Sequence, residues 1–173
     1  MPRELKLRSL TKDDEPAFVA AQRAMEPEGF EFGFYYDEGM VWVDYLDLMA
    51  AHSRGEGLAA GRVAASLLVA DVDGVLVGRV SLRHDLNEWL AEVGGHIGYC
   101  VLPAHRRRGH ATQMLRQSLV VAAGLGIPNV LVTCDEDNLG SRKVIEANGG
   151  VFERHAINPD GPLKRRYWVP TSG

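Results

Sequence analysis

A strand that passes through a short basic turn into an amphipathic helix constrains this chain more than any other stretch. The run 101–111, VLPAHRRRGHA, contains this junction. Free backbone N–H groups and the helix dipole favour an anion at the start of a helix, and the turn adds cationic side chains. Gly109 has no Cβ, so a ligand can approach the backbone there. The junction therefore predicts a site for the phosphates of a nucleotide cofactor.

The segments around this junction alternate between strands and helices. Residues 94–101 alternate in polarity as a strand does, and residues 129–134 form a short apolar run typical of a buried strand. One helix begins near Ala111, and Asp137 or Asn138 can cap a second helix. The order is therefore strand, helix, strand, helix.

Weaker patterns cover the rest of the chain. Asp73-Gly74 is a two-residue turn signal between apolar runs, which predicts an antiparallel hairpin. We expect helices over residues 17–25 and 41–51, and hairpins over residues 66–72 with 75–83 and 151–157 with 163–169. No repeat or linker interrupts these elements, so we expect one domain.

Two motifs carry a family resemblance. The spacing Arg106-x-x-Gly109-x-Ala111 resembles the Arg/Gln-x-x-Gly-x-Gly/Ala signature of the GNAT superfamily of N-acetyltransferases, and residues 135–150 are similar to the second helix that faces the cofactor in that family. The resemblance extends to a bacterial branch of predicted acetyltransferases. It implies a single GNAT domain over residues 1–173, an α/β (α+β) fold with a mixed, mostly antiparallel sheet of six or seven strands and helices on both faces.

The resemblance also implies the cofactor and its contacts. Acetyl-CoA is the expected cofactor and CoA the product, with the pantetheine arm between the strands at 94–101 and 130–134. A backbone N–H near Val101 or Leu102 is expected to bind the developing oxyanion. The cofactor-binding residues implied are Val101, Leu102, Arg106, Arg107, Arg108, Gly109, His110, Ala111, Asn138, Ser141 and Arg142.

The expected reaction is transfer of the acetyl group to a primary amine by direct attack in a ternary complex. His96 and Glu92 are the candidate bases, although a hydrogen-bonded strand histidine and a solvated carboxylate explain them equally or better. Many GNAT members carry a tyrosine as general acid where this chain has Ile145. Tyr99 or Tyr167 could replace it, although packing at the sheet surface is the simpler role for both, and a CoA thiolate can also leave without an acid. A non-catalytic acyl-CoA sensor is the alternative function.

The acceptor is expected to meet an aromatic, acidic wall. By resemblance this wall contains residues 30–47 and the pair Tyr167-Trp168. Aromatic faces and carboxylates attract ammonium groups, so we expect a small-molecule or peptide amine that carries a positive charge or an apolar group. The competing interpretation is that most of these aromatic residues form the core.

Composition and charge exclude several partners. The 173 residues are 46% hydrophobic and 24% charged, as in ordinary globular domains. A net charge of −4 gives no bulk attraction to nucleic acid, and no apolar stretch predicts a membrane span or a secretory core. Cys100 and Cys134 have no Cys-x-x-Cys partner. We therefore expect a cytoplasmic protein with reduced thiols and no metal, nucleic-acid or membrane partner, and a homodimer stays open.

Overall fold

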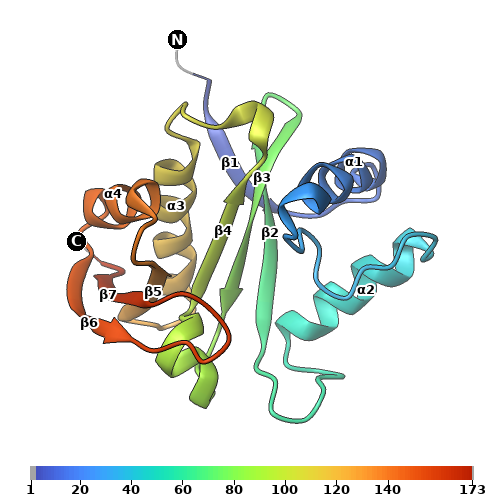
Figure 1. The fold of residues 1–173 in the computed structure, drawn as a ribbon. Coiled ribbons are helices and arrows are strands. Elements are labelled where there is room, and N and C mark those ends of the chain that lie inside the picture. Colours follow the sequence, from blue (N-terminus) through green and yellow to red (C-terminus); the bar gives the residue numbers. More distant parts are fainter. Residues whose placement is uncertain (1–2, 173) are drawn as a thin grey trace.

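A computed structural model describes residues 3–172 of the chain (Figure 1). Its strands are β1 (Leu5–Ser9), β2 (Ala65–Val72), β3 (Val75–Arg83), β4 (Ile97–Val101), β5 (Asn129–Asp135), β6 (Val151–Ala156) and β7 (Lys164–Pro170). Its helices are α1 (Glu15–Met25), α2 (Trp42–Ser53), α3 (His110–Gly124) and α4 (Leu139–Ala147), with short helical turns η1 (Glu26–Glu28), η2 (Leu90–Gly94) and η3 (Pro103–His105). The expected mixed α/β fold with about seven strands is confirmed.

The strands form two antiparallel sheets. One sheet has the order β1-β2-β3-β4 and the other the order β5-β7-β6. Both expected hairpins are present, and Asp73 and Gly74 join β2 to β3 with φ of 52° and 83°, as a primed two-residue turn requires. Figure 1 shows the two sheets side by side, with α1 and α2 beside the first sheet and α3 and α4 on the opposite side.

Strand alternation divides the core of the first sheet into two halves. On β2, Val69 packs with α1 and α2, whereas Ala70 packs with α3. The half under α1 and α2 is aromatic, and its buried rings are Phe18, Phe32, Tyr36, Trp42 and Tyr45. Together with the buried Tyr167, these rings make most of the aromatic residues of the expected acceptor wall part of the core.

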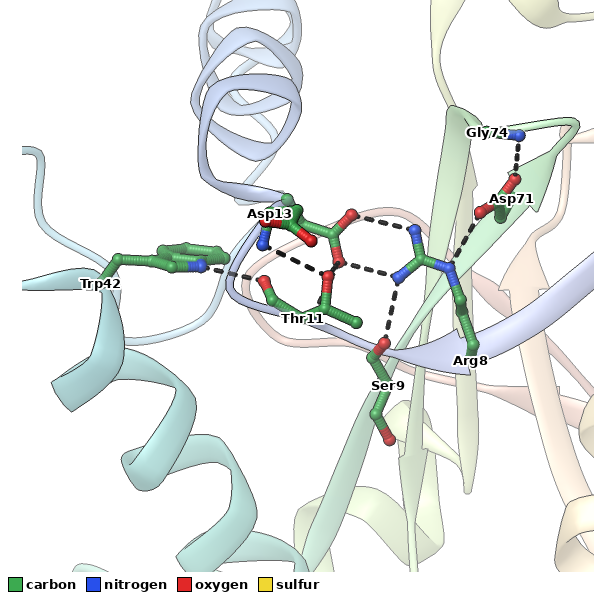
Figure 2. Close-up of polar contacts among 8 residues, drawn as sticks. Arg8, Ser9, Thr11, Asp13, Trp42, Asp71 and Gly74 are labelled. Atoms are coloured by element: carbon green, nitrogen blue, oxygen red, sulfur yellow. Dashed lines mark hydrogen bonds and ion pairs between the residues drawn. The ribbon is translucent and has the colours of Figure 1, made fainter.

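A polar network fixes α1 and α2 to the edge of the first sheet. Arg8 on β1 donates to both carboxylate oxygens of Asp14 at 2.7 and 2.9 Å and to Asp71 on β2 at 2.9 Å (Figure 2). The indole of Trp42 donates to the Thr11 carbonyl at 3.0 Å. Hydrogen bonding to Arg8 lowers the pKa of Asp14, so the carboxylate stays charged and the start of α1 stays attached to the sheet.

The two sheets meet at His96, just before β4. The His96 N–H donates to the Leu131 carbonyl at 2.7 Å, and the Leu131 N–H donates to Nδ1 of the His96 ring at 2.8 Å. Gly95 makes this approach possible, because a Cβ there would lie 2.6 Å from the Leu131 oxygen and its φ is +70°. Beyond this point β4 and β5 are not paired in the described chain. The sheets are therefore joined at one end, next to a gap.

Candidate active site

A cavity of about 580 Å³ lies at the basic junction, between β4 and the first turns of α3 and α4. We call it the junction cavity. Eight of the predicted cofactor-binding residues line it, namely Val101, Arg106, Arg107, Gly109, His110, Ala111, Asn138 and Ser141. Leu102, Arg108 and Arg142 are not among its lining residues. The structure therefore gathers most, but not all, of the predicted set in one place.

The turn before α3 has a backbone shaped for close approach. Arg107 and Gly109 adopt left-handed φ values of 61° and 79°, and a Cβ at Gly109 would point into open space. The turn leads directly into the first turn of α3, whose N–H groups have no partner within the helix. Nδ1 of His110 is buried and has no hydrogen-bond partner among the described residues. The start of α3 thus offers main-chain donors beside the open space in front of Gly109.

Arg106 is already paired with a carboxylate. Its Nη2 lies 2.9 Å from Glu28 Oε2, and its Nε donates to the Val101 carbonyl at 3.0 Å. These contacts join η1 to the end of β4. Arg106 therefore links two elements while it lines the junction cavity, and its contact with the cofactor stays a prediction.

The open edge of β4 supplies main-chain donors. The His96 carbonyl accepts from Arg83 and the Leu102 N–H donates to Val77, so alternation directs the N–H groups of Tyr99 and Val101 away from β3. These two N–H groups face the gap beside β5. The prediction of an N–H donor at Leu102 is wrong because that group belongs to the sheet, whereas Val101 fits the role.

A second cavity, of about 410 Å³, occupies the gap between the sheets, and we call it the gap cavity. Its lining residues come from β3, β4, β5 and β7, from η2 and α4, and from loops that include the one after η1. Phe30, Tyr99, Asn138 and Ser141 line both cavities. A ligand that fills the junction cavity can therefore reach the gap cavity alongside Tyr99.

Tyr99 stands where the two cavities meet. Its hydroxyl is buried and has no hydrogen-bond partner within residues 3–172. Burial raises its pKa to about 12, against a smaller lowering by the nearby Ser141 hydroxyl. An uncharged phenol without a partner is thus held beside the expected route of the cofactor. Tyr167 differs, because its hydroxyl contacts Arg165 and Glu146 and lines neither cavity.

The two predicted bases lie outside both cavities. His96 is buried, and its Nδ1 accepts the Leu131 N–H described above, while burial lowers the pKa of its ring. Glu92 receives two hydrogen bonds of 2.9 Å from Arg154, which hold the pKa of its carboxyl below the ordinary value. The structure thus gives His96 the role of joining the sheets and Glu92 the role of an ion-pair partner.

Asn138, Ile145 and the two cysteines lie in settings that the structure explains without catalysis. Asn138 caps α4, since its Oδ1 accepts the Ser141 N–H at 3.1 Å. Ile145 is fully buried in the core and offers no acid. Cys100 and Cys134 are buried, and burial raises the pKa of both thiols, that of Cys134 to about 11. Neither thiol has the exposed, activated setting of a nucleophile.

Two features are absent from residues 3–172. No group of three or more His, Cys, Asp or Glu side chains in this range could hold a metal ion. Within the same range, no helix is both long and apolar enough to span a bilayer.

Comparison with known proteins identifies the family. The sequence model for the acetyltransferase (GNAT) domain matches residues 4–151. No curated protein sequence matches significantly. Among solved structures, Mycobacterium smegmatis RimJ in complex with CoA-disulfide is similar, with a TM-score of 0.70 and 20% identity over 96% of this chain and 81% of that one.

Two structures from Salmonella typhimurium are also similar. A putative acetyltransferase with acetyl-CoA gives a TM-score of 0.63 and 14% identity over 97% of this chain and 94% of that one. An acetyltransferase that modifies the N-terminal serine of ribosomal protein L7/L12 gives a TM-score of 0.66 and 18% identity over 98% of this chain and 96% of that one. Because the family match covers residues 4–151 and the fold agrees, this chain belongs to the GNAT family of acetyltransferases.

Proposed function

We propose that this chain transfers the acetyl group of acetyl-CoA to a primary amine by direct attack while both substrates are bound. The observation that carries the proposal is the continuity of the junction cavity and the gap cavity at Tyr99. One cavity offers donors at the start of α3, and the other opens beside the unpaired edge of β4. A cofactor and an amine can thus approach one point from different directions.

The residues of the junction cavity fit acetyl-CoA. Open space in front of Gly109 leaves room for a phosphate, and the first turn of α3 favours negative charge. Arg107 adds a cationic side chain to the lining. The unpartnered Nδ1 of His110 is a further polar group that a ligand could satisfy. We therefore place the phosphates here and the acetyl end beside Tyr99.

Bound acetyl-CoA supplies a thioester, whose carbonyl carbon bonds to the amine nitrogen while its C–S bond breaks and CoA leaves. The Val101 N–H, directed into the gap, can donate to the carbonyl oxygen as it gains charge. The Tyr99 hydroxyl stays protonated because its pKa is about 12. A thiol is a stronger acid, with a pKa of about 8.5. We therefore assign Tyr99 a hydrogen bond to the departing sulfur.

The amine must lose a proton during attack, and Glu31 is the acceptor that we propose. Glu31 and Asp135 are the carboxylates among the lining residues of the gap cavity. Asp135 pairs with Lys164, whereas Glu31 forms no ion pair among the described residues. A carboxylate can take the proton directly or through a water. Glu31→Gln should then lower kcat for acetyl transfer.

The experiment that tests this function combines binding with turnover. Acetyl-CoA at about 100 times its Kd should add roughly 2.7 kcal/mol of apparent stability, a clear thermal shift. A panel of primary amines should then release thiol, with intersecting lines in two-substrate kinetics. No shift at millimolar acetyl-CoA would overturn the proposal, and a shift without thiol release from any amine would favour the sensor alternative.

A further inference from the structure

Two arginines of β3 face the α1 and α2 side without a carboxylate partner. Arg79 is only 3% exposed and Arg83 is half-buried, yet neither guanidinium lies within 4.0 Å of a carboxylate oxygen of Asp or Glu in the described chain. Arg166, buried to a similar degree, pairs with Glu153 at 2.8 Å. Buried charges are normally paired, so the two β3 arginines need another explanation.

Arg79 is held by main-chain oxygens and aromatic rings. Its Nε donates to the Phe32 carbonyl and its Nη2 to the Glu31 carbonyl, both at 2.9 Å. Its guanidinium lies 4.8 Å from the ring centres of both Phe30 and Phe34. These contacts fix the loop after η1 over the gap cavity. They leave the full positive charge in place, because none of the partners is an anion.

Arg83 has still fewer partners. Its Nη1 reaches the Gly94 and Gly95 carbonyls only at 3.5 Å, and its Nε and Nη2 have no hydrogen bond within residues 3–172. Gly98 on β4 lies beside both guanidinium groups, since a Cβ there would lie 3.4 Å from Arg83 Nη1 and 3.9 Å from Arg79 Nη1. Arg83 can therefore offer at least two N–H groups to a ligand.

The position of Arg83 connects the gap cavity to a smaller one. It lines both the gap cavity and an apolar cavity of about 120 Å³ under α2, to which Met49, Leu58 and Leu67 contribute. This smaller α2 cavity could receive an apolar group. Glu31 lines the gap cavity as well. Cation, anion and apolar surface thus lie around one space.

We propose that the acceptor amine carries a carboxylate that Arg83 binds, with Arg79 adding positive charge behind it. The chemical class is that of a free amino acid, with its amino group toward Glu31 and Tyr99 and its side chain toward the α2 cavity. This inference rests on the proposed acetyltransferase function and narrows its substrate. It replaces the expectation of a positively charged acceptor, because the acceptor side of the sheet is itself cationic.

The test compares amino acids with their carboxamides as acceptors in thiol release from acetyl-CoA. The α-amino group of a carboxamide is less basic, which favours the amide, so preference for the acid must come from binding. Wild-type protein should prefer the acid about 10- to 100-fold in kcat/KM. Arg83→Gln should abolish this preference and Arg83→Lys should restore part of it. Arg116→Gln, an equal charge change on the exposed side of α3, should leave it unchanged.

A second measurement does not depend on turnover. With CoA bound, N-acetyl amino acids should bind more tightly than their amides by calorimetry, and Arg83→Gln should remove the difference. Equal use of acids and amides, or equal binding of their acetylated products, would overturn the inference while leaving acetyl transfer intact. An Arg83-dependent preference for succinyl-CoA over acetyl-CoA, with acids and amides equal, would assign the carboxylate to the acyl group and also overturn it.

Discussion

The junction cavity and the gap cavity differ in how far apart in the sequence their walls lie. Two short runs, 105–112 and 138–144, supply most of the junction cavity. The gap cavity draws on the chain from Phe30 to Lys164, across four strands of the two sheets, η2, α4 and several loops. A local site leaves a spacing motif in the sequence. A site assembled from distant segments leaves none, and its charge balance becomes visible only in the folded chain.

The largest expected effect tests the junction cavity, whose walls lie close together in the sequence. Gly109→Val should weaken acetyl-CoA binding by more than about 100-fold, because a branched side chain would enter the junction cavity and strain a left-handed residue. Gly126→Val is the matched control, since Gly126 has a φ of +80° and open space at the other end of α3. Calorimetry should show lost binding in the first variant only. Equal affinity in both would show that the phosphates bind elsewhere.

Tyr99→Phe tests the point where the cavities meet. Loss of a hydrogen bond to a charged sulfur should lower kcat by about 10- to 100-fold, with little change in KM for acetyl-CoA. Tyr167→Phe should leave kcat nearly unchanged, because the Tyr167 hydroxyl contacts only Arg165 and Glu146. Steady-state thiol release measures both variants. If Tyr99→Phe retains the wild-type kcat, departure of the thiolate needs no help from this phenol.

His96 tests the joint between the two sheets. His96→Ala should cost about 2 kcal/mol of unfolding free energy at pH 7, because the buried Leu131 N–H loses its acceptor. Burial lowers the pKa of His96 below its unfolded value of about 6.5. Neutral His96 therefore contributes fully to the free energy of unfolding above the unfolded-state pKa. This contribution is lost as the pH falls through the folded-state pKa.

His96→Asn separates the hydrogen bond from the charge. Its Oδ1 can accept from Leu131 but does not titrate, so this variant should lose less stability than wild type between pH 7 and pH 5. Urea unfolding at both pH values measures the difference. If the free energy of unfolding has the same pH dependence in wild type, His96→Ala and His96→Asn, the titration of His96 does not affect the stability of the contact between the sheets.

The smallest expected effect concerns Asn138. Asn138→Ala should cost about 1 kcal/mol of stability through loss of the cap on α4. Asn138 lines both cavities, so if its amide nitrogen donates to the cofactor, acetyl-CoA affinity should also fall. Asn138→Asp keeps the capping oxygen but removes the amide donor. If the two variants bind acetyl-CoA like the wild type, Asn138 is a cap and nothing more.

The sequence predicted those elements that short, local residue patterns specify. Residue periodicity and turn residues predicted both hairpins and all four helices, and the motif around Gly109 lies in the wall of the junction cavity. The partners of individual side chains could not be predicted in this way. Arg106 has the spacing of a phosphate ligand, yet Glu28 lies 78 residues away in the sequence and 2.9 Å away in space. Strand alternation places Arg79 and Arg83 on one face but does not reveal that no carboxylate meets them.

The unpaired N–H groups of Tyr99 and Val101 make β4 an edge strand that faces inward. On the outside of a protein such an edge can template aggregation, and chains usually guard it with charges, prolines or bulges. Here the second sheet stands opposite the edge, joined to it at His96. A strand from another molecule would have to separate the two sheets to pair with it. The chain can therefore keep main-chain donors free for a ligand without exposing them to its neighbours.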